Sequence, residues 1–222
     1  MPSVLITGCD TGLGRELASQ YAQSGFQVVA TYRDIANRLP DAAMRHLPLD
    51  VTDFAQFAAL KRSISDEPID VLVSNAGIGL DIGALGSLDF DYLRSMLMVN
   101  TVGPLKLVET FVDNVAASEQ RRIVLVTSRM GSIGSNLSGG HYGYRASKAG
   151  LNAIGRSLAL DLFKRRITLI LLHPGWVNTA GGGVDAPVSV QESVAGMRNV
   201  IARLGNHETG QFYTYDGQPL PW

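Results

Sequence analysis

Short runs of consecutive apolar residues alternate with longer stretches in which apolar positions recur every three or four residues. The runs predict strands, and the longer stretches predict amphipathic helices. The predicted strands lie within residues 3–7, 26–32, 44–51, 69–77, 121–128, 167–175 and 210–215. The predicted helices lie within residues 13–25, 53–65, 91–118, with an interruption near Gly103 and Pro104, 144–166 and 189–205.

The strand runs are apolar at consecutive positions, which is typical of a parallel sheet covered by helices on both faces. The strand and helix segments alternate along the chain, and this order predicts an α/β fold with a doubly wound, Rossmann-type parallel sheet. The sequence has no repeat, low-complexity tract or linker, so we expect a single domain over residues 1–222.

The polar and glycine-rich segments follow four of the predicted strands, after Thr7, Val73, Thr127 and His173. In open α/β sheets, ligands bind in the crevice beyond the carboxyl ends of the strands. We therefore expect one crevice to collect residues from all four segments.

Composition narrows the classes of partner. Lys and Arg number 19 against 20 Asp and Glu, and the formal net charge is −1. This balance gives no electrostatic reason to expect nucleic acid or an anionic membrane as partner. The N-terminal residues do not resemble a signal peptide, and no apolar run is long enough to span a bilayer. The one cysteine, Cys9, allows no internal disulfide, which agrees with a cytoplasmic protein.

The segment "TGCDTGLG" joins the first predicted strand to the first predicted helix. Its glycines, Gly8, Gly12 and Gly14, are spaced G-x3-G-x-G. Glycine permits a tight turn and lets the backbone approach a pyrophosphate at the helix N-terminus. A tight connection without a ligand would have the same glycines, but the position after the first strand favours a nucleotide site.

The glycine spacing resembles the T-G-x3-G-x-G of the short-chain dehydrogenase/reductase family. Further segments match that family in order: "SNAG" at residues 74–77, Asn100, "TSRMGS" from Thr127, "YRASK" from Tyr144 and "PGWVNT" from Pro174. The resemblance runs from residue 3 to at least residue 179. The ending "GQFYTYDGQPLPW" is also similar to the C-factor-like, or sniffer-like, branch of carbonyl reductases.

The resemblance implies a nicotinamide dinucleotide cofactor. It places Asp50 beside the adenine ring, although Asp50, like Asp53, could instead cap the following helix. The further cofactor contacts that we infer from the matched segments are Thr11, Leu13, Val51, Asn75, Ala76, Gly77, Pro174, Gly175, Val177 and Thr179.

The choice between NAD(H) and NADP(H) depends on the end of the second strand. Family members that prefer NAD have an acid there, and the corresponding residue is Tyr32. Arg33 follows and is suited to a bidentate contact with a 2′-phosphate. Asp34 lies about 20 residues past the glycine turn, as an NAD-type acid does, but beyond the apparent strand end. We therefore predict NADP(H) in preference to NAD(H).

Tyr144 and Lys148 are four residues apart, so a helix places them on one face, one turn apart. Tyr142 does not have this spacing. A nearby ammonium favours the phenolate, so we expect Lys148 to lower the pKa of Tyr144, which would carry the proton. The resemblance also implies that Lys148 holds the nicotinamide ribose.

Ser128 ends a predicted strand and leads the S-x-x-G pattern of the family, and this resemblance implies that it donates a hydrogen bond to the substrate oxygen. Ser132 is the competing serine. The distance from Ser128 to Tyr144 is longer than in most of the family, which predicts a longer loop at the mouth of the site. Asn100 matches a family asparagine that lets water connect the lysine to solvent, and a locally satisfied polar residue at a helix bend is compatible with this role.

The predicted function is NADP(H)-dependent interconversion of a carbonyl and an alcohol, with a small-molecule substrate and no metal ligands assigned. The alternatives are a non-catalytic NADP-binding sensor and a signalling or developmental protein on the same fold. The segment "AGGGVDAPV" after Thr179 is short and glycine-rich, so we expect it to be mobile and the site to be open. Long helices after Asp89 and Tyr144 could form symmetric contacts in a homodimer or homotetramer.

Overall fold

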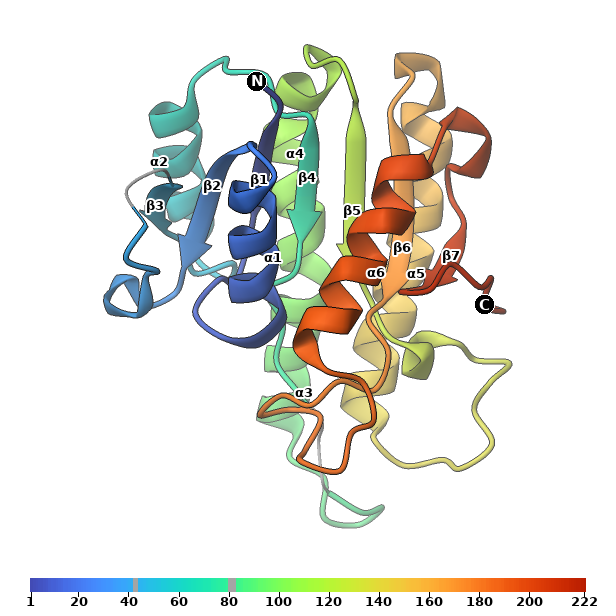
Figure 1. Cartoon of the computed structure of the whole chain (residues 1–222). Coiled ribbons are helices and arrows are strands. Elements are labelled where there is room, and N and C mark those ends of the chain that lie inside the picture. Colours follow the sequence, from blue (N-terminus) through green and yellow to red (C-terminus); the bar gives the residue numbers. More distant parts are fainter. Residues whose placement is uncertain (42–43, 80–82) are drawn as a thin grey trace.

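Parallel strands form one twisted sheet in this computed structural model, which describes residues 1–41, 44–79 and 83–222. Within these residues the sheet has seven strands, in the order β3-β2-β1-β4-β5-β6-β7 (Figure 1). This is the predicted doubly wound arrangement, with the reversal of strand order between β1 and β4. The strands are β1 Ser3–Ile6, β2 Gln27–Tyr32, β3 Met44–Pro48, β4 Val71–Ser74, β5 Arg122–Val126, β6 Thr168–His173 and β7 Phe212–Thr214.

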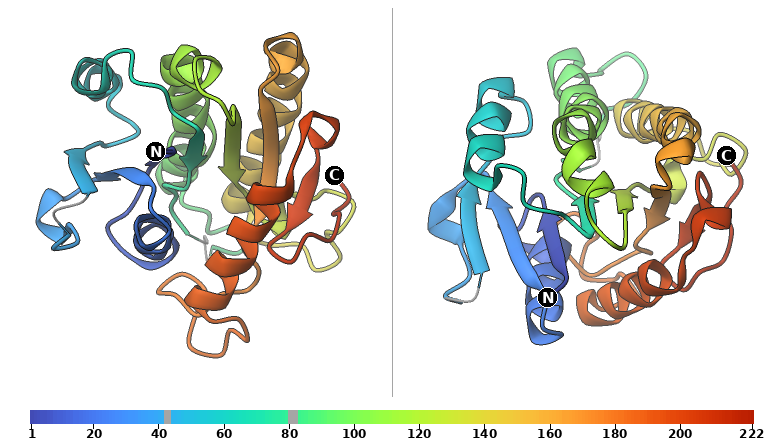
Figure 2. Two further views of the ribbon diagram at one scale, coloured as in Figure 1. Left: turned by 45° about the horizontal axis from the view of Figure 1, so that its top comes forward. Right: turned by 90° about the horizontal axis from the view of Figure 1, so that it is seen from above.

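Helices cover both faces of the sheet (Figure 2). One layer contains α1 (Gly12–Gln23) and α6 (Val190–Arg203), and the other contains α2 (Phe54–Ile64), α4 (Gly103–Ala116) and α5 (Tyr142–Leu162). Side chains along a strand alternate between the two layers, as Val4 and Ile6 pack with α1 and α6 while Leu5 packs with α2 and α4. Both faces of each central strand are therefore apolar, as the continuous hydrophobic runs predicted.

The long helical stretch in the middle of the chain differs from its predicted form. It begins with α3 (Phe90–Leu97), where the Asp89 carboxylate caps the helix by accepting hydrogen bonds from the Asp91 and Tyr92 amides. A π-helical segment, Met98–Val102, then joins α3 to α4. The predicted interruption thus lies just before Gly103 and Pro104, and it is a widened turn centred on Asn100 rather than a break.

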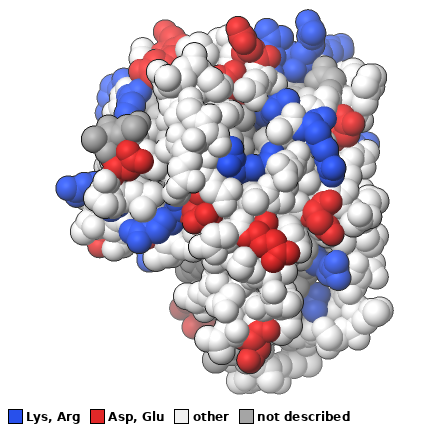
Figure 3. Space-filling view, in the orientation of Figure 1, with Lys and Arg blue, Asp and Glu red and all other residues white. Residues whose placement is uncertain are grey.

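The loops that follow β1, β4, β5 and β6 all lie at the carboxyl end of the sheet, the lower edge in Figure 1. No helix among the described residues is long and apolar enough to cross a membrane. On the face shown in Figure 3, acidic and basic side chains are interspersed. The ligand crevice predicted from the sequence is therefore expected at the carboxyl end of the sheet, where these four loops meet.

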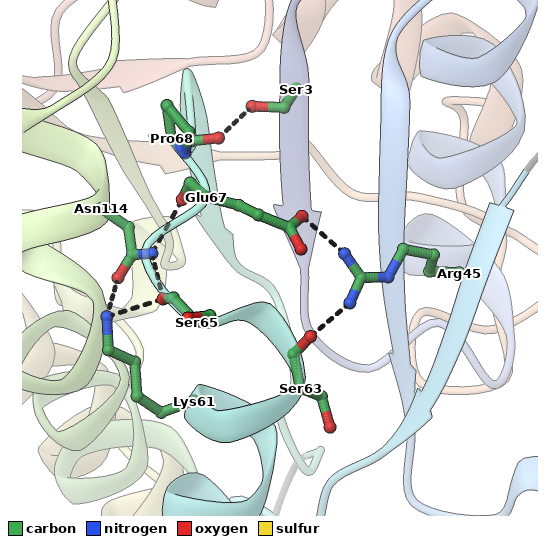
Figure 4. Close-up of polar contacts among 8 residues, drawn as sticks. All are labelled: Ser3, Arg45, Lys61, Ser63, Ser65, Glu67, Pro68 and Asn114. Carbon is green, nitrogen blue, oxygen red and sulfur yellow. Dashed lines mark hydrogen bonds and ion pairs between the residues drawn. The ribbon is translucent and has the colours of Figure 1, made fainter.

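The opposite, amino end of the sheet is held by a buried asparagine (Figure 4). The Asn114 amide nitrogen donates to the carbonyl oxygens of Ser65 (2.9 Å) and Glu67 (2.8 Å), and its oxygen accepts from Lys61 (2.6 Å). Ser65 has a left-handed φ of 55°, so the chain between α2 and β4 makes a strained turn that these contacts fix.

Asn114→Ala is expected to lower the free energy of unfolding by about 2 kcal/mol, because it leaves buried backbone carbonyls without their donors. For a chain of this size, the melting temperature falls by roughly 4–8 °C. Thermal unfolding measures the change, with Asn37→Ala as the matched control because Asn37 is exposed. Equal melting temperatures for the two variants would show that the contacts of Asn114 do not stabilise the fold.

Candidate active site

A cleft of about 1450 Å³ opens at the carboxyl end of the sheet. Its walls come mainly from the loops that follow the seven strands and from the first turns of α5. Every residue that the sequence predicted to bind cofactor or substrate lines this cleft except Asn100, which is buried behind it. The volume exceeds that of a typical small-ligand pocket and fits a dinucleotide together with a small substrate.

The glycine turn after β1 has no room for side chains. A Cβ atom on Gly8 would lie 2.7 Å from the Cα of Ala76, and one on Gly14 would lie 2.0 Å from the Gly8 carbonyl oxygen. Thr11 occupies the N-cap position of α1 but makes no side-chain capping hydrogen bond. The turn thus presents backbone amides to the cleft at a helix N-terminus, which is the arrangement that binds a phosphate group.

Two residues fix the turn after β4 to the glycine turn. The Thr7 hydroxyl accepts hydrogen bonds from the amides of Asn75 and Ala76, each at 3.1 Å. The Asn75 side chain donates to the carbonyl oxygens of Thr7 and Gly8 at 3.0 and 3.1 Å. Asn75 therefore shapes the site through the backbone, and Thr7 is a positioning residue that the sequence analysis did not identify.

At the end of β2, Tyr32 is fully buried in the core, and its hydroxyl lies 3.1 Å from Nδ1 of His46. Arg33 is exposed and lines the cleft. The Asp34 carboxylate accepts from the Ala36 amide at 2.9 Å, and Asp34 does not line the cleft. Of the two candidate selectivity residues, only Arg33 faces the site.

Asp10 fixes the backbone just after β2, and the sequence analysis did not identify it. Its carboxylate accepts hydrogen bonds from the backbone amides of Arg33 (3.1 Å) and Asp34 (3.0 Å). Asp50 also lines the cleft and accepts from Thr52, whereas Asp53 caps α2. Asp53, and not Asp50, therefore caps α2.

Tyr144 and Lys148 lie one turn apart near the start of α5, and the Lys148 Nζ atom is 5.8 Å from the centre of the Tyr144 ring. The Lys148 ammonium donates to the Val126 carbonyl oxygen at 3.1 Å. Burial lowers the pKa of Lys148 to about 8. The helix begins at Tyr142, two residues before the predicted start, and Tyr142 does not line the cleft.

The prediction that the pKa of Tyr144 is lowered was wrong. Burial raises the pKa of Tyr144, and a hydrogen bond with Ser128 only partly opposes this change. The cause is desolvation. Burial removes the phenolate from water, and the stabilisation that nearby groups give the phenolate is smaller than the hydration that it loses. Tyr144 is therefore protonated at neutral pH.

The two candidate serines have different surroundings. Ser128 lines the cleft, forms a hydrogen bond with Tyr144 and accepts from the Met130 amide at 3.1 Å. Ser132 is buried outside the cleft lining, where its hydroxyl lies 3.2 Å from the Trp222 carbonyl oxygen and accepts from the Ser135 amide. The geometry thus favours Ser128 as the group that meets a substrate.

Asn100 has partners distant in sequence rather than the local backbone. Its oxygen accepts from the Ile78 amide at 2.9 Å, and its nitrogen donates to the Ile78 carbonyl and the Ser147 hydroxyl, each at 3.1 Å. The π-helical segment places the side chain against both the turn after β4 and α5. Asn100 therefore joins the two segments that carry Gly77 and Lys148.

The loop after β6 closes the far side of the cleft. Gly175 has a φ of +91°, and a Cβ there would lie 3.0 Å from the Tyr215 ring. Thr179 approaches the glycine turn, since a Cβ on Gly12 would lie 3.5 Å from its methyl group. Backbone carbonyls in the glycine-rich segment after Thr179 accept hydrogen bonds from the Trp176 indole (2.7 Å) and the Asn178 amide (3.2 Å), so the segment is tied to the strand-end loop.

The longer loop predicted between Ser128 and Tyr144 runs past the mouth of the cleft. Arg145 holds it by donating to the Gly140 carbonyl (3.2 Å) and the Ser138 hydroxyl (3.0 Å). Arg129, His173 and Asp216 also line the cleft, and none of them was predicted as a site residue. Arg129 follows Ser128 directly, and this adjacency is the sequence signal that could have identified it.

The sequence of this chain is similar to those of known proteins. A family model described as short chain dehydrogenase matches residues 2–185. The C-signal protein of Myxococcus xanthus is 40% identical over 164 residues, covering 74% of this chain and 99% of that protein.

Solved structures share the whole fold. The carbonyl reductase Sniffer of D. melanogaster superposes with a TM-score of 0.92 at 32% identity, covering 100% of both chains. An NADPH-bound carbonyl reductase from chicken fatty liver superposes with a TM-score of 0.88 at 27% identity, covering 100% of this chain and 99% of that one.

Proposed function

Because the chain belongs to the short-chain dehydrogenase family of oxidoreductases, in its carbonyl reductase branch, we propose that it reduces a carbonyl compound to an alcohol with NADPH. One observation carries this proposal. Tyr144, hydrogen-bonded to Ser128 and one helical turn from Lys148, faces the same cleft as the glycine turn.

The cleft suits a nicotinamide dinucleotide. The glycine turn leaves space that a side chain would fill, and its amides suit the pyrophosphate. Asp50, Val51, Asn75, Ala76 and Gly77 would line the adenosine side. The nicotinamide side would be lined by Pro174, Gly175, Val177 and Thr179. The bound cofactor would supply the hydride, which is the chemistry that no side chain here provides.

The protein's own residues manage the proton. In this proposal Tyr144 donates its phenolic proton to the carbonyl oxygen as the hydride reaches the carbonyl carbon, so an alcohol and NADP⁺ form. Ser128 donates a hydrogen bond to the same oxygen and stabilises its developing charge. Lys148 holds the cofactor ribose and stabilises the tyrosinate that remains until a proton from solvent replaces the lost one.

The protonation states favour the reductive direction. Burial raises the pKa of Tyr144, so the tyrosine holds its proton at neutral pH and is ready to act as an acid. Alcohol oxidation needs the opposite state, a tyrosinate that accepts the hydroxyl proton. The oxidative reaction should therefore need a higher pH than the reductive one.

Arg33 supports NADP(H) in preference to NAD(H). Arg33 is exposed and lines the cleft where β2 ends, and the residue before it, Tyr32, leaves no acid at the strand end. The NADPH-bound structure with the same fold agrees with this choice.

Arg33→Ala is expected to raise the Michaelis constant for NADPH by about 10- to 100-fold, because a charge-assisted contact with the 2′-phosphate is lost. The constant for NADH should change by less than about twofold, since NADH has no phosphate there. Steady-state kinetics with each cofactor measure both values. Equal increases for the two cofactors would contradict this role of Arg33.

A screen of aldehydes, ketones and diketones tests the proposed function directly. NADPH absorbance follows the reaction, and chromatography identifies the alcohol product. Consumption of NADPH with formation of an equal amount of alcohol supports the proposal. Tight NADPH binding without consumption in any reaction would instead favour a non-catalytic sensor.

The relative named C-signal supports a second reading, in which a signalling role accompanies catalysis. The two readings separate in a Tyr144→Phe variant that binds NADPH but does not turn over. A biological effect that survives in this variant would depend on binding rather than on the reaction.

A further inference from the structure

Arg129 lies at the substrate end of the cleft and has no role in the proposed proton transfer. It follows Ser128 directly and lines the same cleft as Ser128, Tyr144 and Lys148. Its side chain is exposed, and its guanidinium makes no hydrogen bond or ion pair with any residue that the structure describes. A cation at this place is available to a bound molecule.

The other two arginines of the cleft show why this availability is informative. The Arg145 guanidinium is used to hold the loop that ends at His141. Arg33 has no side-chain partner among the described residues, and we assign it to the cofactor phosphate. Arg129 has the same unpaired state at the opposite end of the cleft, beside the reacting groups.

The charges around Arg129 favour an anion at this end. Asp216 is the acidic residue that lines the cleft here, and its carboxylate accepts a hydrogen bond from the Thr214 hydroxyl. This hydrogen bond and, to a smaller extent, the charge of Arg129 lower the pKa of the Asp216 carboxyl, so the two side chains interact electrostatically without forming an ion pair. Burial, with help from the charge of Arg129, lowers the pKa of His173 to about 4, so His173 is neutral. At this end of the described lining, the basic residues Arg129, Arg145 and Lys148 outnumber the one acidic residue, Asp216. The other acidic residues that line the cleft, Asp10 and Asp50, belong to the glycine turn and to the loop after β3.

The same end of the cleft also offers apolar surface. Trp176 lines it and is 57% exposed, and Met130 and Tyr215 line it as well. An aromatic wall accommodates an apolar or aromatic body, whereas a guanidinium binds a carboxylate through two parallel hydrogen bonds.

We propose that the substrates of this enzyme are carbonyl compounds that carry a carboxylate group, and that Arg129 selects them by binding the carboxylate while Ser128 and Tyr144 hold the carbonyl oxygen. This assignment rests on the proposed carbonyl reduction and adds a substrate class to it. Arg129 acts here as a specificity-determining residue and takes no part in the proton transfer.

The test compares 4-carboxybenzaldehyde with its methyl ester, which has the same aldehyde and ring but no charge. Wild-type protein should reduce the acid with the higher kcat/KM. Arg129→Gln should lower kcat/KM for the acid by about 10- to 100-fold, the range of a charge-assisted hydrogen bond, and leave the value for the ester within about twofold. Arg129→Lys should restore part of the preference, and Arg62→Gln, a change at an exposed arginine outside the cleft, should alter neither value.

A binding measurement separates failure of this inference from failure of the proposed function. Calorimetry with NADPH-saturated protein should show that benzoate binds wild-type protein and binds Arg129→Gln about tenfold or more weakly. If neither aldehyde is reduced but benzoate binds through Arg129, the proposed reaction fails and the anion site stands. Equal reduction of acid and ester, or equal benzoate binding by wild type and Arg129→Gln, overturns the assignment of Arg129.

Discussion

Replacement of Tyr144 by phenylalanine is expected to lower kcat by about 10²- to 10⁴-fold, the contribution of a general acid placed at the reacting oxygen. The ring remains and keeps the packing of α5, but the carbonyl oxygen loses its proton donor. NADPH should still bind with nearly unchanged affinity, because the cofactor contacts at the glycine turn and at Lys148 are intact. Stopped-flow absorbance with saturating NADPH and aldehyde measures the rate.

Tyr142→Phe is the matched control, since it removes the same hydroxyl from a tyrosine that does not line the cleft. This variant should keep kcat within about twofold of the wild-type value, as expected for an exposed substitution outside the site. A large loss in Tyr142→Phe, or full activity in Tyr144→Phe, would show that the proton comes from elsewhere.

Replacement of Ser128 by alanine has the second largest expected effect. The hydroxyl forms a hydrogen bond with Tyr144, and we propose that it stabilises the oxygen of the substrate during reduction. Loss of one such donor lowers kcat by about 10²- to 10³-fold. Because Ser128 also opposes the raised pKa of Tyr144, the variant should hold the tyrosine proton more strongly and oxidise alcohols still more slowly.

Ser132→Ala is the control for this prediction. Its hydroxyl contacts the Trp222 carbonyl and the Ser135 amide, so the variant should lose about 1 kcal/mol of stability while keeping most of its kcat. Paired measurements of melting temperature and turnover distinguish the two serines. If Ser132→Ala abolishes turnover and Ser128→Ala does not, the assignment is reversed.

Local spacing made the centre of the site predictable from sequence. A glycine turn between a strand and a helix, and a tyrosine and lysine four residues apart, each specify geometry within a single element. The continuous apolar runs likewise predicted the parallel sheet, because a strand that helices cover on both sides has no polar face.

The features that escaped sequence analysis depend on contacts between distant segments. The raised pKa of Tyr144 comes from burial by surrounding elements, which residue spacing does not show. The partners of Asn100 are 22 and 47 residues away, and Ser132 meets a residue 90 positions further along the chain. Asp10 acts on the backbone of Arg33, so its type alone gave no sign of its role.

The central claim is that this cleft reduces a carbonyl compound with NADPH and takes the proton from Tyr144. A single-turnover experiment tests it most directly, with NADPH-loaded protein mixed with excess aldehyde and both NADPH and alcohol quantified. We predict that wild-type protein converts its bound NADPH into an equal amount of alcohol in one rapid phase, and that Tyr144→Phe binds NADPH but shows this phase slowed by about 10²-fold or more. Bound NADPH that wild-type protein never oxidises, or an equally rapid phase in Tyr144→Phe, would contradict the claim.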